Sequence, residues 1–331
     1  MNPVSDMTRR QTNSVLEAAA RASLRAPSVF NTQPWRWRIA GGGMELSAEP
    51  ARRLEATDPQ GRLLRLSCGA ALHHARIALA AAGWSARVER LHAETHPHLL
   101  ARLRLGQQVS PDPEAKLMAD AISRRRTDRR AFGERKVAQK TIDRLRRLVE
   151  AEGAYLHVVP DEQVPMLAIS AELAGDAELL DPAYREELTR WTSRPAWTGD
   201  GVPPSTAVQQ ALRRVPVRNF IPDGSAGLKA GPDYDEGALY VVLFGMTDDP
   251  VDLLRGGEAL SALLLKATAE GLSTAPLSDA VEVTWPRNLV RGLLSDIGDP
   301  YVVVRLGYVE SDETLPATPR RPPAETISVE E

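Results

Sequence analysis

Apolar positions recur with helical spacing along some stretches of this chain and alternate with polar positions along others. Residues 14–24 have the helical pattern and end just before Pro27, and the Ala-rich residues 61–83 form a longer stretch that ends at Gly83. Between and after them lie runs that predict strands, the first two joined by three glycines as a hairpin. These predicted strands are 35–40, 44–50, 84–91 and 98–106.

A polar, proline-containing link at residues 107–114 separates this first part from the rest of the chain. We place a boundary there, which predicts two units, residues 1–108 and 109–331. The second unit combines helical spacing with alternating apolar runs. Its predicted helices are 114–125, 141–152, 164–177, 253–271 and 284–295, and its predicted strands are 154–160, 238–246 and 301–309.

Residues 181–233 follow neither the helical nor the strand pattern. They contain Trp191, Trp197 and many prolines and glycines. So long an irregular insertion in a compact domain is usually a lid or a linker. The aromatic residues favour a packed lid.

Two segments of the chain resemble each other. Residues 65–84 and 254–272 both run from a glycine and small residues into an apolar Ala/Leu helix that ends at a glycine, before a strand. We interpret them as equivalent helices of two related units. A chance likeness between Ala-rich helices is the alternative.

Composition narrows the class of protein. Lys plus Arg number 41 and Asp plus Glu number 44, so no strong positive field favours binding to nucleic acid or membrane. Cys68 stands alone, which excludes an intrachain disulfide and fits a reducing compartment. No apolar leader or membrane-spanning run is visible. We therefore expect a cytoplasmic protein with no nucleic-acid or membrane partner.

An arginine-rich stretch, SRRRTDRRAF at residues 123–132, brackets Thr127 and Asp128 with five arginines. Guanidinium groups and a hydroxyl are the donors that a phosphate needs. A solvated basic turn is the other interpretation. The sequence PRRP at 319–322 adds two arginines near the end.

Motifs for metal binding or nucleophilic catalysis are missing. His73 and His74 are adjacent on a helix, and His92, His96 and His98 lie around a short loop, so we expect surface groups and no metal site. There is also no nucleophile elbow, Walker loop or dinucleotide-binding glycine motif. This profile is typical of a protein whose chemistry belongs to a bound cofactor.

The loop APSVFNTQPW at 26–35 is similar to the A-P-S-x-x-N-x-Q-P-W signature of flavin-dependent nitroreductases. RRTDRRAF resembles their R-R-S-x-R-x-F element with one extra residue, and AEGLSTAPLSD resembles their ring-contacting segment. RLGY followed by PRRP resembles their late strand and terminal arginine. The resemblance implies an α+β, nitroreductase-like fold, with mixed but mainly antiparallel sheets and surrounding helices.

The order of these motifs is similar to that of the mycobacterial Acg-type branch of the family. It implies two diverged units fused into a pseudo-dimer: a truncated unit at 1–108 that provides the loop, and a unit at 109–331 with the main FMN site and a lid-like insertion at about 181–233. Because only one such loop is present, we expect one FMN per chain.

The resemblance also implies a set of FMN-binding residues. Arg125, Arg126 and Thr127, helped by Arg320 or Arg321, would hold the phosphate and ribityl chain, and Arg129 would face the pyrimidine edge. The segment along the ring, where many relatives have Glu–Gly against Ser278–Asp279, would be Pro276, Leu277, Ser278 and Asp279. The first unit would provide Pro27, Ser28, Asn31 and Gln33.

Three functions remain open from the sequence. The first is an FMN-dependent oxidoreductase that passes hydride from NAD(P)H to a nitroaromatic or quinone acceptor and needs no catalytic residue of its own. The second is an FMN storage protein whose lid aromatics Trp191, Trp197, Phe220 and Tyr234 close over the flavin. The third is a flavin-free interaction protein. The assembly is open between a monomer and a homodimer.

Overall fold

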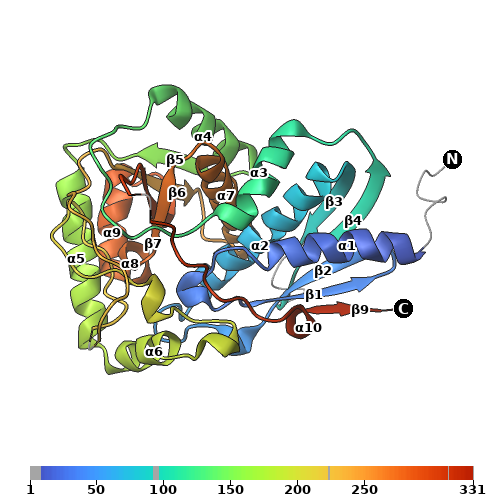
Figure 1. Ribbon diagram of the computed structural model, residues 1–331, viewed down its shortest axis with the longest axis horizontal. Helices are drawn as coiled ribbons and strands as arrows, with labels where there is room; N and C mark the ends of the chain where they lie inside the picture. The colour runs from blue at the N-terminus through green and yellow to red at the C-terminus, as the bar shows by residue number, and fades with distance from the viewer. Residues whose placement is uncertain (1–8, 92–96, 223, 312, 331) are drawn as a thin grey trace.

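Two β-sheets, each flanked by helices, make up the computed structural model, which describes residues 9–91, 97–222, 224–311 and 313–330 (Figure 1). The architecture is α+β. Among the described residues, no helix is both long enough and apolar enough to cross a membrane. The longer helices are α1 (Arg9–Ser23), α2 (Arg62–Ala81), α3 (Pro113–Arg124), α4 (Gln139–Ala151), α5 (Val164–Leu180), α6 (Pro182–Thr192), α7 (Pro250–Ala269) and α9 (Thr284–Leu293); α8 (Asp279–Glu282) and α10 (Pro323–Thr326) are short.

The first sheet has the strand order β3-β4-β2-β1-β9. Along β1, Trp35, Trp37 and Ile39 are buried while Arg36 and Arg38 are exposed, because successive side chains of a strand point to opposite faces. The sheet is antiparallel except where β9 pairs with β1. Its strands are β1 (Trp35–Ala40), β2 (Gly43–Ala48), β3 (Trp84–Arg90), β4 (Leu99–Gln108) and β9 (Ile327–Val329).

The second sheet is antiparallel and has the order β5-β6-β8-β7. Its central strand β8 is buried along almost its whole length, so both faces of the strand are covered. The four strands are β5 (Tyr155–Val158), β6 (Leu239–Gly245), β7 (Ser273–Leu277) and β8 (Asp299–Gly307).

The two sheets repeat one topology. Each unit runs strand, strand, long helix, strand, strand, and the orders β3-β4-β2-β1 and β7-β8-β6-β5 match position for position. The helix is α2 in the first unit and α7 in the second, which are the two segments that resemble each other in sequence. Two related units are therefore visible in the fold.

Helices α2 and α7 pack against each other in the centre of the molecule (Figure 1). Gly69 and Gly257 lie at the crossing: a Cβ on Gly69 would overlap the carbonyl oxygen of Leu254, and one on Gly257 would overlap that of Leu66. Glycine at both positions lets the two backbones approach more closely than any side chain permits.

The segment between β5 and β6 is more ordered than its sequence pattern suggests. We expected residues 181–233 to be irregular, but they include helix α6, whose N-terminus is capped by Asp181 through a 2.8 Å bond from the Ala183 N–H. The rest of the segment is turns and extended chain. Tyr184, Leu188 and Trp191 of α6 pack with Phe30 and Phe220 into a separate apolar cluster. The insertion is therefore packed against the loop that carries Phe30, and its role as a lid stays a prediction.

The C-terminal segment after β8, which we call the tail, contains a short strand that the sequence pattern did not predict. The tail crosses from β8 back to the first sheet, where β9 pairs in parallel with β1. The sequence boundary at residues 107–114 therefore does not separate two independent bodies, because residues 319–330 lie against the first unit.

The histidine prediction was wrong for His73 and His74, which are buried between α2 and α7. Their Nδ1 atoms lie 2.7 and 2.8 Å from the hydroxyl oxygen of Ser261, so a polar contact between the helices removes them from the surface. His98 is exposed, and His92 and His96 lie outside the described residues.

Candidate functional site

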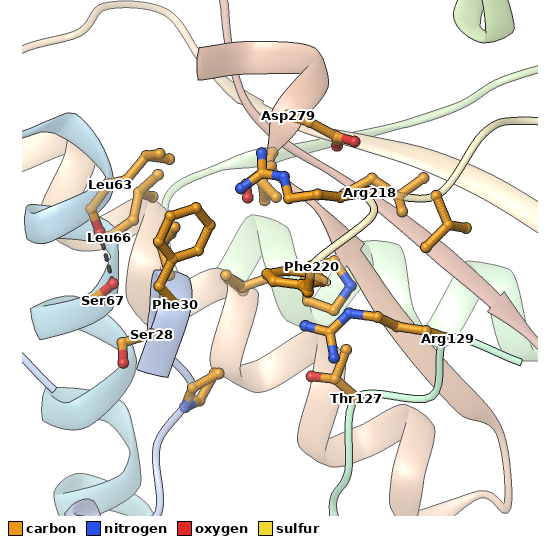
Figure 2. Close-up of a pocket in the computed structure, with 18 residues that line it drawn as sticks. Ser28, Phe30, Leu63, Leu66, Ser67, Thr127, Arg129, Arg218, Phe220 and Asp279 are labelled. Carbon is orange, nitrogen blue, oxygen red and sulfur yellow. Dashed lines mark hydrogen bonds between the residues drawn. The ribbon is translucent and has the colours of Figure 1, made fainter. Parts of the chain in front are cut away.

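A cavity of about 800 Å³ lies where the two units and the insertion meet. Figure 2 shows its walls: Leu63, Leu66 and Ser67 from α2 on one side, and Thr127 and Arg129 from the chain after α3 on the other. The loop before β1, the end of β7 and the insertion complete it. The remaining lining residues are Pro27, Ser28, Val29, Phe30, Val217, Arg218, Phe220, Leu260, Pro276, Leu277, Ser278, Asp279 and Val302.

The loop at residues 27–33 reaches the cavity in a strained conformation. Phe30, Asn31 and Gln33 all have positive φ, between 49° and 55°. Each such residue costs about 1–3 kcal/mol and persists only where surrounding contacts hold it. The Ser28 hydroxyl accepts a 2.9 Å hydrogen bond from the Gln33 backbone N–H, which closes the loop on itself.

Asn31 and Gln33 hold this loop against the insertion and the tail. The Asn31 amide donates to the carbonyls of Gly201 and Pro319, and the Gln33 amide donates to the carbonyl of Gly199. The Gln33 side-chain oxygen accepts from the backbone N–H of Arg321. Gln33 does not line this cavity, so its role is to position the loop.

A second cavity of about 570 Å³ adjoins the first and shares Pro27, Ser28, Phe30, Thr127 and Arg129 with it. The far end of this cavity is basic. Its arginines are Arg125, Arg126 and Arg320, and the part of the chain that the structure describes places no carboxylate in an ion pair with any of them.

Several nitrogens of these arginines are buried without a hydrogen-bond partner: Nε and Nη1 of Arg125, Nε of Arg126 and Nε of Arg320. Burial, with repulsion from neighbouring arginines, lowers the pKa of Arg125 to about 10 and that of Arg320 to about 9. Buried charges are normally paired. The unpaired donors therefore fit an anion at this end.

Three other arginines of the stretches 123–132 and 319–322, Arg124, Arg130 and Arg321, have different surroundings; of these three, only Arg321 was in the predicted FMN-binding set. Arg124 is exposed, and Arg130 forks onto the Asp128 carboxylate at 2.9 and 3.0 Å. Arg321 is buried, bonds Glu49 at 2.9 Å and the Gln33 carbonyl, and lines neither cavity. Of the two candidate tail arginines, only Arg320 faces the basic cavity.

The stretch after α3 is held at its place by β7. Thr127 forms an isolated parallel bridge with Thr274, and the Asp128 N–H donates to the Thr274 carbonyl at 2.9 Å. Pro276 and Leu277 end β7 and Ser278 precedes α8, so Asp279 begins that helix at the cavity wall. Thr127, Arg129 and the segment 276–279 therefore share one cavity with Pro27 and Ser28 of the first unit.

Among the described residues, no carboxylate lies within hydrogen-bonding distance of the Arg129 guanidinium. Its guanidinium stacks on the Phe220 ring, with 4.3 Å from Cζ to the ring centroid. Burial and the nearby Arg218 lower the pKa of Arg129 to about 10, against an opposing effect from Asp279.

The insertion also contributes to the cavity wall. Phe220 meets Phe30 edge to face at 5.8 Å between ring centroids, and the Arg218 guanidinium lies 5.1 Å from the Phe30 ring (Figure 2). Three of the four expected lid aromatics do not line the cavity: Trp197 is 84% exposed, Tyr234 is 56% exposed, and Trp191 is buried elsewhere. Trp191 is buried within the insertion itself, against Arg52 and Arg194.

Sequence reasoning missed Arg218 and the three α2 side chains. Leu63, Leu66 and Ser67 belong to an apolar helix face that has the same pattern as any core helix. Arg218 stands in a stretch with no periodic pattern, and only the fold brings it to Asp279 and Phe30. No signal in the sequence distinguishes it from the other arginines.

Comparisons with known proteins extend this picture. No family model matches the chain. "Putative NAD(P)H nitroreductase acg" of Mycobacterium tuberculosis H37Rv is 37% identical over 321 residues, 96% of each chain. "Putative NAD(P)H nitroreductase Rv3131" of the same strain is 37% identical over 302 residues, 90% of this chain and 87% of the relative.

Solved structures give a weaker likeness. The FMN-dependent nitroreductase NfnB from Mycobacterium smegmatis in complex with NADPH is 18% identical with a TM-score of 0.42, over 66% of this chain and 99% of its own. An FMN-dependent nitroreductase from Clostridium difficile is 11% identical with a TM-score of 0.35, over 59% and 90%. The assignment rests on the full-length mycobacterial relatives: this chain belongs to the Acg-type branch of the nitroreductase-like family.

Proposed function

We propose that the chain binds FMN and transfers hydride from NAD(P)H to a nitroaromatic or quinone-type acceptor. One observation carries the proposal: a largely apolar cavity runs directly into a basic one whose buried arginine nitrogens have no partner. A flat ring would fit the apolar cavity, and a phosphate joined to it by a polar chain would fit the basic one. The names of the mycobacterial relatives support the nicotinamide donor.

In this proposal Arg125, Arg126 and Arg320 hold the phosphate. Thr127 lies where the two cavities join and bonds the ribityl chain. Asn31 lines the second cavity and also bonds Arg320. Gln33 and Arg321 act indirectly, because they line neither cavity and their contacts fix the loop and the tail that carry Pro27, Ser28 and Arg320.

Pro27 and Ser28, with the segment Pro276, Leu277, Ser278 and Asp279, line the cavity that would hold the ring of the cofactor. FMN, when bound, provides the hydride chemistry of the reaction. Arg129 faces the edge of the ring on which negative charge collects, and its cation favours that charge in a low-dielectric cavity.

Two measurements test the proposal. Purified protein should show flavin absorbance, or acquire it with FMN at one equivalent per chain, because the described residues form one such paired cavity. FMN-loaded protein should then oxidise NADPH or NADH with a quinone or nitroaromatic acceptor faster than free FMN does. Colourless protein that ignores added FMN would contradict flavin binding and favour an interaction protein, whereas a ratio of two would contradict the fused pseudo-dimer with a single site.

FMN storage with little turnover is a second candidate, and the lid favours it. Phe220 and Phe30 line the first, largely apolar cavity, which we call the ring cavity. They would therefore compete with a nicotinamide for the exposed face of a flavin ring. The Phe220→Ala variant separates the two functions. Faster oxidation of NADPH by Phe220→Ala than by the wild type supports the lid as a barrier, and equal, brisk turnover by both proteins contradicts storage.

We also propose a cytoplasmic location, since Cys68, the only cysteine, is buried with its thiol against the Pro34 carbonyl. The two units already meet around the site, so the proposed activity requires no second chain. Size-exclusion chromatography with light scattering distinguishes a monomer from a homodimer.

A further inference from the structure

A cluster of acidic side chains surrounds Arg218 behind the ring cavity. Its guanidinium lies 2.6 Å from the Glu282 carboxylate and 3.3 Å from that of Glu178, and all three side chains are at least nine-tenths buried. Asp279 of α8 and Tyr184 of α6 complete the surroundings. Arg129, the next cation, faces Asp279 from the other side of the ring cavity.

This cluster contains more carboxylates than cations, and several of its buried polar atoms lack a hydrogen-bond partner. Three carboxylates, Glu178, Glu282 and Asp279, face one guanidinium. Nε and Nη1 of Arg218, one oxygen of Glu282 and the hydroxyl of Tyr184 are buried without a partner. The crowding of buried carboxylates around Arg218, with Arg129 facing only Asp279, favours a proton on at least one of them.

A further cavity of about 750 Å³, which we call the acidic cavity, connects the cluster to the surface. Glu178, Tyr184, Arg218 and Asp279 line its inner part, and the exposed side chains of Glu172 and Asp176 line its outer part. Asp279 and Arg218 line the ring cavity as well, so they form the wall between the two spaces. The polar surroundings are suited to water.

We propose that Asp279 is a proton donor to the reducible acceptor, and that Glu178 restores its proton from water in the acidic cavity. This rests on the proposed function. An acceptor that has taken a hydride carries the added electron pair on an oxygen. The O–H bond of Asp279 breaks, the proton bonds that oxygen, and the electron pair of the broken bond stays on the carboxylate.

The pKa directions agree with this geometry. Burial raises the pKa of Glu178 to about 9, with a further increase from Glu282 and an opposing effect from Arg218. Burial likewise raises the pKa of Asp279, again opposed by Arg218 and strengthened by Glu282. The Glu178 shift keeps a proton in the cluster at neutral pH, and the Asp279 shift acts in the same direction.

Single-turnover reoxidation tests the relay without using NAD(P)H. FMN-loaded full-length protein is reduced with dithionite and mixed with benzoquinone from about pH 6 to about pH 10. We expect the wild-type rate constant to fall about tenfold per pH unit above the Glu178 pKa of about 9. The variants Glu178→Gln and Asp279→Asn should be at least about tenfold slower at neutral pH and lack this inflection.

Glu187→Gln is the matched control. Glu187 is buried too, but on α6 it bonds the Thr57 N–H and hydroxyl and not the cluster. It should keep the wild-type profile. Equal pH profiles for the wild type, Glu178→Gln and Asp279→Asn, each with FMN retained, would overturn the relay and leave the proposed function intact.

Infrared spectroscopy gives a readout independent of turnover. The wild type minus Glu178→Gln difference spectrum near neutral pH should contain the C=O band of a protonated carboxyl, and its absence would overturn the inference. A wild-type protein that benzoquinone cannot reoxidise would contradict the proposed acceptor reaction, and this band alone then decides whether the cluster holds the proton.

Discussion

Arg125 combines deep burial with unpaired donors, and the half-buried Arg320 also has one unpaired nitrogen. Each guanidinium destabilises the folded chain when no anion is present, because its charge is desolvated and faces other arginines. Arg320 offsets part of this cost by bonding the Asn31 side chain at 3.1 Å, whereas Nε and Nη1 of Arg125 lack a partner. Arg125 is therefore the better probe of the anion site.

We expect Arg125→Met to weaken FMN binding by about tenfold to a hundredfold, the usual effect of losing charge-assisted hydrogen bonds. The same change should leave the apo protein at least as stable as the wild type, since it removes an uncompensated charge. Quenching of FMN fluorescence and thermal unfolding without ligand measure the two effects. Arg124→Met, one residue away and exposed, is the control; equal FMN affinity in the wild type and Arg125→Met would refute the assignment.

Asp58 provides a test through pH. It caps the start of α2 by accepting the Leu64 N–H at 2.8 Å, and burial raises its pKa from 3.8 to about 6. The folded state therefore holds the proton more tightly than the unfolded state between these values, and stability falls as pH rises through them.

The contribution amounts to about 3 kcal/mol lost between about pH 4 and pH 7. Asp58→Asn should remove it, so the variant gains stability relative to the wild type over that range. Urea unfolding at several pH values measures the difference, and parallel curves for the two proteins would show that Asp58 does not titrate in this way.

Residue type alone does not predict which arginines face the cavities. Arg125, Arg126 and Arg129 face the cavities while Arg124 and Arg130 do not, yet all five stand within seven residues. The difference depends on the direction in which the chain leaves α3, which the bridge between Thr127 and Thr274 sets. That contact joins residues far apart in sequence, so no local pattern predicts it.

At the scale of elements, the crossing of α2 and α7 determines how the two units meet. We expect Gly257→Ala to destabilise the protein by at least about 3 kcal/mol, because the new Cβ would overlap the Leu66 carbonyl and the two backbones must separate. Urea unfolding measures this change.

Gly175→Ala is the matched control for that substitution. Gly175 is also helical, in α5, but a Cβ there meets no atom within 4 Å. The change should stabilise the protein by about 0.5–1 kcal/mol, since alanine is the better helix former. If Gly257→Ala were equally harmless, the helices would not be in the close contact described.

Elements with strong periodicity were predicted within a few residues, among them α2, α7, strands β1 to β4 of the first sheet and strands β5, β6 and β8 of the second. The short strand β7 was not predicted. Helix α6 was missed because Trp191 and the surrounding prolines and glycines hide its short apolar face. Strand β9 was missed for a different reason: three residues carry no pattern, and its partner β1 lies almost the whole chain away. Tertiary pairing, rather than local preference, determines both.

At the scale of the whole molecule, the tail joins the two units through Arg320, Arg321 and β9. Deleting residues 319–331 should abolish tight FMN binding and lower the midpoint of thermal unfolding, because it removes a phosphate ligand and a strand of the first sheet. Arg320→Met keeps β9. It should lower the affinity for FMN but reduce the stability only by the loss of the contact with Asn31. A shortened chain that binds FMN as tightly as the wild type would contradict this role of the tail.

The return of the tail to the first sheet also has a consequence for biosynthesis. Arg320 and β9 are made after every other wall of the site, so the basic end stays incomplete until the ribosome has passed residue 329. If Arg320 holds the phosphate as proposed, we expect a nascent or prematurely terminated chain to retain the cofactor less tightly than the finished chain. Cofactor loading would then follow translation, and a loaded molecule would be one in which this last stretch has been made and docked.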